Sequence, residues 1–226
     1  MNYIVTAYYT KGTIYEEYAE NFILSLKKFG LFYEITPIDD FKDWYKGMQY
    51  KPTFLKQMLE KHYPHSIVYV DIDAIFCRYP NFFDHLDRTP EVNIALHVLD
   101  HSKYRRKEHP PELLSGTIFL KNTKEVKEII NRWIYECSQD SKLWDQRALE
   151  RVLKNYRYHL LPEEYCMIFD YMSSIKDPVI KHFQASRVAR RNSGVCKKGQ
   201  GTPRKTINKR TPRRVEKEGV IRIKRS

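Results

Sequence analysis

Apolar residues follow two spacings along the first 185 positions of the chain. Short runs rich in Val, Ile, Tyr and Phe are typical of β-strands, and apolar residues three or four positions apart are typical of amphipathic helices. Because the two patterns alternate, they predict an α/β fold with a mostly parallel sheet, right-handed crossovers and flanking helices. The predicted strands are residues 3–8, 33–38, 66–70, 92–97, 114–120 and 179–183, and the predicted helices are residues 16–29, 52–61, 123–137 and 145–153.

Capping and breaking residues set the ends of these helices. Gly30 follows the first helix and is expected to end it, and Pro52 is expected in the first turn of the second. Asn122 is the predicted N-cap of the long third helix, and Glu125, three residues on, is its capping-box partner.

Charge divides the chain into two parts. The net charge of the 226 residues is +12. Residues 187–226 hold 15 lysines and arginines against two acids, a net +13, which leaves residues 1–186 with 25 bases and 26 acids, a net −1. We therefore predict one folded domain at 1–186 and a basic C-terminal extension at 187–226.

Three absences narrow the class of protein. No run of 18 apolar residues predicts a membrane-spanning helix, and residues 1–10 lack the basic start and cleavage site of a secretion signal. The four cysteines are far apart, which favours free thiols in a reducing compartment over a zinc site; they are Cys77, Cys137, Cys166 and Cys196. The expected location is the cytoplasm. If the protein comes from a virus, this is the cytoplasm of the host cell.

Two carboxylates follow the most hydrophobic strand. Residues 66–76 read S-I-V-Y-V-D-I-D-A-I-F, so Asp71 and Asp73 come directly after the predicted strand end at Val70. Ligands of open α/β sheets bind at the carboxyl ends of the strands, and carboxylate oxygens are the ligands that Mg²⁺ and Mn²⁺ prefer. The alternative is that the two side chains only cap a turn after the strand.

The D-I-D segment and its surroundings resemble the D-x-D motif of nucleotide-sugar glycosyltransferases with the GT-A fold. The resemblance covers roughly residues 1–191 and is greatest to small retaining nucleotide-diphospho-sugar transferases. The segments that carry it are Y-K-P-T-F-L at 50–55, V-Y-V-D-I-D-A-I-F at 68–76, S-G-T-I-F-L-K-N-T at 115–123, W-D-Q-R-A-L at 144–149 and I-K-H-F-Q-A-S-R at 180–187.

The resemblance implies a Rossmann-like GT-A domain that uses a divalent metal. The ion would stabilise the charge that builds on the diphosphate of a nucleotide-sugar donor as the glycosidic bond breaks. Asp73 is expected to bind it directly, Asp71 less directly, and His182 as a third ligand, a mixed set that suits Mn²⁺ at least as well as Mg²⁺. The alternative for His182 is a satisfied structural histidine.

The same resemblance assigns further residues to the donor, with a UDP-sugar favoured. Thr6, Ala7 and Tyr9 would meet the nucleotide base, and Lys51 the donor phosphate or ribose, although a lone lysine is more often a solvated cation. Arg187, with the arginines at 190 and 191, would neutralise the diphosphate unless these residues only begin the basic extension.

The sugar of the donor would meet a different set of residues. Ser115 and Gly116 would form the floor of its pocket, because a glycine lets backbone approach a ligand closely. Asp145 and Gln146 would hydrogen-bond its hydroxyls and complete the catalytic set with Asp71 and Asp73. The alternative for Asp145 is capping of the helix that it begins.

The acceptor is open among three interpretations of residues 187–226. The basic extension is typical of polyanion binding, so the acceptor could be nucleic acid, for example a hydroxymethylated base that is flipped out of a duplex. An anionic membrane beside a lipid-linked or other saccharide acceptor is the second interpretation. The third is a solvated extension without a ligand.

Two other functions compete with sugar transfer. Phosphatases of the haloacid dehalogenase class also place D-x-D after a strand, but that motif usually starts the chain, and seventy residues precede it here. The other candidate is a non-enzymatic nucleic-acid-binding protein, against which the intact set of Asp71, Asp73 and His182 argues.

Overall fold

A computed structural model describes residues 2–104 and 108–185 of the chain. The larger of its two sheets has six strands in the order β2-β1-β3-β6-β5-β7. All its strands run in one direction except β6, which is antiparallel to both neighbours, so the sheet is mostly parallel as predicted. The strands are β1 (Tyr3–Thr10), β2 (Tyr33–Ile38), β3 (Ser66–Val70), β5 (Ile94–Leu99), β6 (Glu112–Leu120) and β7 (His159–Leu160).

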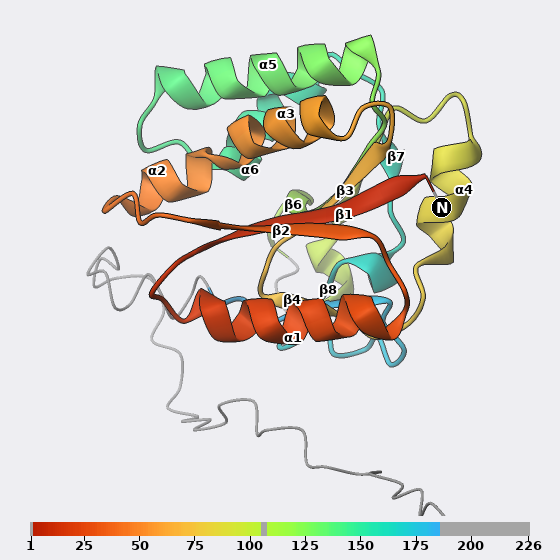
Figure 1. Ribbon diagram of the computed structural model, residues 1–226. Coiled ribbons are helices and arrows are strands. Elements are labelled where there is room, and N and C mark those ends of the chain that lie inside the picture. Colours follow the sequence, from red (N-terminus) through yellow and green to blue (C-terminus); the bar gives the residue numbers. More distant parts are fainter. Residues whose placement is uncertain (1, 105–107, 186–226) are drawn as a thin grey trace, which may run out of the picture.

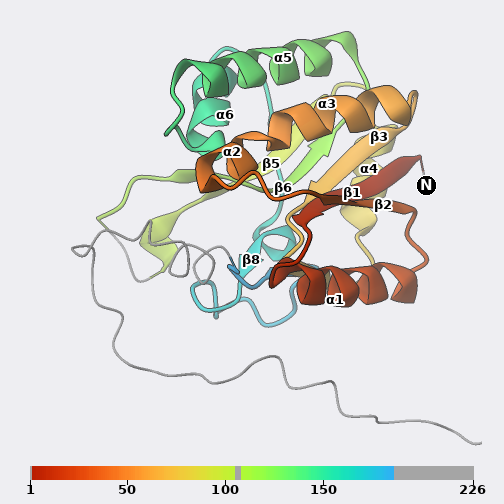
Figure 2. The same cartoon turned by 60° about the vertical axis from the view of Figure 1, so that its left-hand side comes forward.

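Helices cover both faces of this sheet (Figure 1). On one face α3, α5 and α6 pack against the apolar side chains of β3 and β6, with Trp133 fully buried among them. On the other face α1 and α4 pack around Phe22 and Phe83. Figure 2 shows the same two layers from another side. The helices are α1 (Tyr15–Lys28), α2 (Trp44–Gln49), α3 (Lys51–Lys61), α4 (Asn81–Arg88), α5 (Lys124–Gln139) and α6 (Asp145–Leu153), with single 3-10 turns η1 (His101–Lys103) and η2 (Glu163–Tyr165).

A second, three-stranded sheet brings the end of the described chain to the end of β3. Its strands are β4 (Ala74–Phe76), β9 (Ile180–His182) and β8 (Met167–Ile168), in that order. In the antiparallel β4–β9 pair Ala74 lies opposite His182, and the Phe183 amide donates to the carbonyl of Asp73 at 2.8 Å. Backbone pairing therefore fixes Asp73 beside His182.

Strand β6 is irregular where it passes the end of β3. Its partners in β5 step from Leu96 opposite Ile118 to His97 opposite Leu114, so residues 115–117 of β6 fall between two consecutive residues of β5. Such bulges bend a strand and turn its side chains in new directions. The irregularity places Ser115, Gly116 and Thr117 around Asp71, whose amide donates to the Gly116 carbonyl at 2.8 Å.

The predicted elements are present, with every end within two residues of its predicted position, but the predicted helix cap is wrong. Thr123, not Asn122, caps α5, and its hydroxyl accepts from the Val126 amide. Asn122 instead donates to the carbonyls of Leu59 and His65. Glu125 is consequently the second residue of the helix and not the third, which a capping box requires.

The strands β4, β7 and β8 and the helices α2 and α4 were not among the predicted elements. They are short, and a pattern of two to eight residues does not establish a period. Within residues 2–104 and 108–185, none of the helices combines the length and the apolar composition needed to cross a membrane.

Candidate active site

A cavity of about 840 Å³ opens at the carboxyl ends of β1 and β3. This is the edge at which ligands of open α/β sheets bind. Seven of the predicted site residues line it: Tyr9, Lys51, Asp71, Asp73, Ser115, Asp145 and Gln146. The two carboxylates that follow β3, those of Asp71 and Asp73, thus line a cavity large enough for a substrate.

The two oxygens of Asp71 have different surroundings. Oδ1 accepts a hydrogen bond from the Tyr69 hydroxyl at 2.8 Å and lies 3.1 Å from the ammonium of Lys51. Oδ2 faces Gly116 and the ring of His182. Because Oδ1 is held by two donors, the carboxylate is fixed with Oδ2 directed toward the histidine.

Asp73 is buried and does not cap a local turn. Its Oδ2 accepts from the Ala185 amide at 2.6 Å, far along the chain. Burial, and after it the nearby charge of Asp71, raises the pKa of Asp73 to about 7. A cation between the two carboxylates would relieve their repulsion and favour the ionised form of Asp73.

His182 is buried with one ring nitrogen committed to a hydrogen bond. The Thr117 hydroxyl donates to the Tyr165 carbonyl at 3.1 Å, so its oxygen accepts from Nε2–H of His182 at 2.9 Å. Burial lowers the pKa of His182 to about 4, which keeps the ring neutral near pH 7. This network assigns the proton to Nε2 and leaves the lone pair of Nδ1 for a ligand.

Asp71, Asp73 and His182 together form a group that could hold a metal ion. Each offers one ligand atom, and these atoms lie within 4.8 Å of one another. A Cβ at Gly116 would lie 3.1 Å from Oδ2 of Asp71 and 3.5 Å from Nδ1 of His182, so the glycine keeps the space between them open. Two carboxylates and a neutral imidazole suit Mn²⁺ or Mg²⁺, and Thr117 and Tyr69 would orient the ligands from behind.

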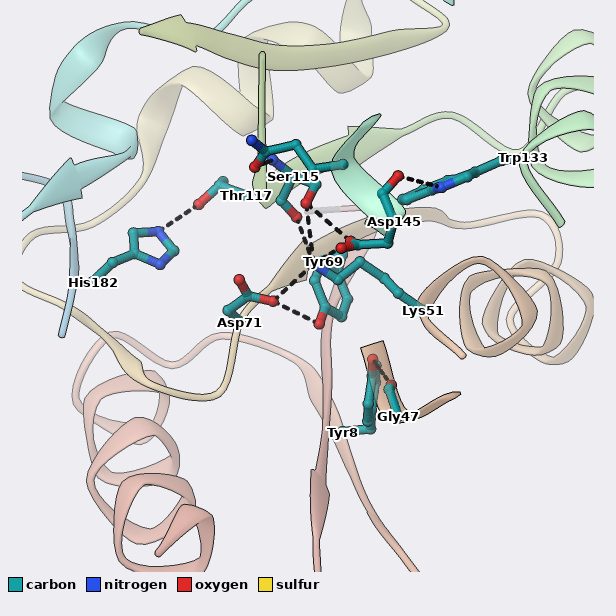
Figure 3. Close-up of polar contacts among 11 residues, drawn as sticks. Tyr8, Gly47, Lys51, Tyr69, Asp71, Ser115, Thr117, Trp133, Asp145 and His182 are labelled. Carbon is teal, nitrogen blue, oxygen red and sulfur yellow. Dashed lines mark hydrogen bonds and ion pairs between the residues drawn. The ribbon is translucent and has the colours of Figure 1, made fainter. Parts of the chain in front are cut away.

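A buried ammonium joins Asp71 to the far wall of the cavity. The Nζ atom of Lys51 lies 3.1 Å from Asp71 Oδ1 and 3.0 Å from Asp145 Oδ2, with its side chain only 7% exposed (Figure 3). Burial favours the neutral amine, but the charges of Asp145 and Asp71 outweigh it and raise the pKa of Lys51. Lys51 is therefore a charged, paired residue and not a solvated cation.

Asp145 does not cap the helix that it begins. Trp144 occupies the N-cap position without a side-chain hydrogen bond. The Asp145 carboxylate instead accepts from Ser115 Oγ at 3.1 Å and pairs with Lys51. The carbonyl of Asp145 accepts from the buried Trp133 ring, which anchors the start of α6.

A second polar chain continues along the same wall. Gln146 accepts from the Ser115 amide at 3.3 Å and donates to Glu112 at 2.7 Å. Nε2 of the buried His101 lies 3.1 Å from Glu112, and its Nδ1 lies 2.8 Å from the Tyr171 hydroxyl. Glu112 and His101 line the cavity, yet neither stands in a motif that sequence analysis could have recognised.

The remaining predicted residues lie in three places. Gly116 and His182 lie behind Asp71, as described. Thr6 and Ala7 are fully buried on opposite faces of β1 and do not line the cavity, whereas Tyr9 at the end of the strand does. Arg187 and the rest of the basic extension lie outside the described residues.

The sequence of the chain is similar to that of one known protein family. A sequence model of nucleotide-diphospho-sugar transferases matches residues 39–189, about two thirds of the chain. No curated protein sequence matches. The matched region contains every segment of the candidate active site except the end of β1.

Solved structures of similar fold are glycosyltransferases. One is involved in the glycosylation of the major capsid of PBCV-1, with a TM-score of 0.59 and 15% identity over 86% of this chain and 98% of that chain. GlyE of Streptococcus pneumoniae TIGR4 has a TM-score of 0.56 and 16% identity over 81% of this chain and 54% of that one. The bifunctional WbbM has a TM-score of 0.54 and 11% identity over 80% and 45% of the two chains. At these identities the likeness is one of fold, and the chain spans about half the length of the last two.

Removing the ammonium of Lys51 should destabilise the domain. The change Lys51→Met leaves the buried carboxylate of Asp145 without its partner, which we expect to cost about 3–5 kcal/mol in the free energy of unfolding. The measurement is urea denaturation of the purified protein. The double variant Lys51→Met/Asp145→Asn should recover part of the loss.

The control for this experiment is an exposed ion pair. Lys61 is 59% exposed and pairs with Glu34, so Lys61→Met should cost less than about 1 kcal/mol. Equal losses from Lys51→Met and Lys61→Met would contradict the assignment of Lys51 as the ion that neutralises Asp145.

Proposed function

The chain belongs to the nucleotide-diphospho-sugar transferase family, and on that premise we propose that it moves a sugar from UDP to an acceptor hydroxyl with a divalent metal ion, Mn²⁺ or Mg²⁺. Family membership favours sugar transfer over the phosphatase and over a non-enzymatic binding protein. The observation that supports metal dependence is the convergence of Asp71, Asp73 and His182 at the floor of the cavity.

The residues that would hold the ion are Asp71 through Oδ2, Asp73 through its carboxylate and His182 through Nδ1. When bound, the ion would supply electrostatic stabilisation of the charge that builds on the departing nucleoside diphosphate. The side chains behind these ligands hold them in place: Tyr69 and Lys51 hold Asp71, and Thr117 holds His182. Such fixed ligands need little rearrangement when the ion binds.

The donor sugar is assigned to the wall formed by β6 and the start of α6. Ser115, Asp145 and Gln146 are adjacent there and offer oxygens and an amide to its hydroxyl groups. Lys51 holds Asp145 and Asp71 at a fixed separation, so the sugar-binding and metal-binding sides of the cavity are held by one cation. The role of Lys51 is therefore to position carboxylates, and not to meet the donor phosphate.

The nucleotide is assigned to the part of the cavity where β1 leads into α1. Tyr9, Thr10 and Thr13 line this part, which offers an aromatic ring and hydroxyl groups to a base and a ribose. The choice of uracil rests on the family resemblance. Thr6 and Ala7 shape β1 beneath this site.

Replacing one metal ligand should abolish both ion binding and turnover. Asp73→Asn keeps the size of the side chain and removes its charge. We expect the affinity for Mn²⁺, measured by electron paramagnetic resonance without donor, to fall at least tenfold. Hydrolysis of a panel of UDP-sugars should fall by orders of magnitude, because the ion contributes several kcal/mol to leaving-group stabilisation.

The matched control is Asp177→Asn, which changes an exposed aspartate outside the cavity. It should bind Mn²⁺ and hydrolyse the donor as the unaltered protein does. Full turnover of Asp73→Asn, or full turnover of the unaltered protein in EDTA, would contradict the metal-dependent proposal.

We propose that residues 187–226 bind nucleic acid. The observation that favours it is their net charge of +13 in a chain whose remaining residues are near neutral. Removing residues 197–226 takes away 12 bases and two acids and leaves Arg187 in place. We expect the truncation to weaken DNA binding steeply while donor hydrolysis continues, and the affinity of the full chain to fall linearly with salt on logarithmic axes.

The measurement is fluorescence anisotropy with labelled single- and double-stranded DNA at a series of salt concentrations. The folded domain serves as its own control, since its near-neutral charge should give a weak salt response. Equal affinity with and without residues 197–226, or a flat salt response of the full chain, would remove nucleic acid as a partner of the extension.

A further inference from the structure

We propose that Phe41, Trp44, Trp144 and Glu112 form the acceptor site of this enzyme, and that it takes a neutral saccharide. These four residues are called the acceptor wall. The inference rests on the proposed sugar transfer and adds the class of acceptor to it. None of the four has a role in the donor and metal sites described above.

Aromatic side chains from two distant segments of the sequence line the cavity: Phe41 and Trp44 from one, and Trp144 from the other. The rings of Trp44 and Trp144 are 5.7 Å apart and cross at 72°. Trp144 is 42% exposed and Phe41 is 38% exposed, although both line the cavity. Large aromatic surface left accessible at a cavity is typical of a ligand site, because in a core it would be covered.

The backbone around the acceptor wall is held by specific hydrogen bonds. The carboxylate of Asp43 caps α2 by accepting from the amides of Tyr45 and Lys46. From the end of α2, Gln49 donates to the carbonyls of Asp140 and Leu143 at 2.9 and 2.7 Å. These bonds join the segment that carries Trp44 to the loop that carries Trp144, so the wall exists before a ligand arrives.

The positions of Trp144 and Glu112 fit an acceptor rather than a nucleotide. Trp144 directly precedes Asp145, which we assign to the donor sugar, so a ring stacked on Trp144 would lie beside that sugar. Glu112 adjoins the same place through its 2.7 Å hydrogen bond with Gln146. Its carboxylate could accept a hydrogen bond from an acceptor hydroxyl, and His101 holds it from behind.

The charge of the cavity excludes a polyanion more readily than a neutral molecule. Among the described residues that line it, six are acids and two are lysines: Asp40, Asp43, Asp71, Asp73, Glu112 and Asp145 against Lys42 and Lys51. Their net charge is −4. The two positive charges of a divalent cation and the two negative charges of a donor diphosphate would roughly cancel each other. The net negative charge of the lining residues would then remain, and it would repel the phosphates of a phosphodiester acceptor.

A saccharide matches both features of the wall. The C–H groups of a pyranose ring form an apolar face that can rest on an aromatic ring, while its hydroxyls point outward and donate to carboxylates. A peptide hydroxyl would need no such aromatic surface. A DNA base could stack on it, but its phosphates would meet the acidic residues.

The experiment measures transfer and donor hydrolysis side by side in the full chain. Radiolabelled UDP-glucose, UDP-galactose and UDP-N-acetylglucosamine are each supplied with Mn²⁺. The acceptor probes are a set of neutral oligosaccharides, a set of sialylated and sulfated ones, DNA with 5-hydroxymethylcytosine, and a peptide rich in serine and threonine. We expect label on the neutral oligosaccharides at least tenfold above the other probes.

Variants of the wall then connect the transfer to these residues. For Trp144→Ala we expect the ratio of transfer to hydrolysis to fall about tenfold or more, as for an anchoring aromatic contact, and Trp144→Tyr should restore most of it. Glu112→Gln should raise the KM for the saccharide. The matched control is Tyr135→Ala, an aromatic residue that is 61% exposed on α5 outside the cavity, which should leave the ratio unchanged.

The outcomes separate this inference from the proposed function beneath it. Metal-dependent hydrolysis with label only on DNA, on the peptide or on anionic saccharides, or with no label on any probe, would overturn the acceptor assignment and leave the donor site intact. An unchanged ratio in Trp144→Ala would also overturn it. The loss of hydrolysis with every donor would instead overturn the proposed function, and this inference with it.

Discussion

The candidate active site depends on the buried ion pair that Lys51 makes with Asp71 and Asp145. One ammonium, almost excluded from water, neutralises a carboxylate from the end of β3 and another from the start of α6. A buried charge without a partner is strongly unfavourable, so separating these three side chains would destabilise the domain. The proposed metal-binding and sugar-binding sides of the cavity are consequently held at a fixed separation by this ion pair, whose ammonium comes from α3.

The sequence predicted the layout of the domain and the position of two carboxylates at its ligand-binding edge. Alternating periods of apolar residues indicate the α/β fold, and the hydrophobic run before Asp71 and Asp73 places both carboxylates at the ligand-binding edge of the sheet. These features depend on local sequence and on general rules of α/β packing. For that reason the helix over residues 52–61 and the strand over residues 66–70 needed no knowledge of distant contacts.

What could not be predicted depends on pairings between distant segments. The short β4 strand has no period of its own and exists because β9 pairs with it, which also brings His182 to Asp73. The bulge in β6 sets which residues surround Asp71, and the hydrogen bonds of Gln49 bring Trp44 to Trp144. In each case the sequence shows the residues but not the contact between them. Asn122 is a further example, because its side chain donates to the carbonyls of Leu59 and His65 instead of capping α5.

The central claim is that Asp71, Asp73 and His182 hold one divalent ion in a glycosyltransferase cavity. Anomalous diffraction from crystals grown with Mn²⁺ and UDP tests it directly, because it locates the ion without reference to activity. The account predicts a single strong peak bounded by Oδ2 of Asp71, the carboxylate of Asp73 and Nδ1 of His182, next to the diphosphate. A peak elsewhere, no peak in crystals that contain UDP, or a histidine turned to bind through Nε2 would contradict it.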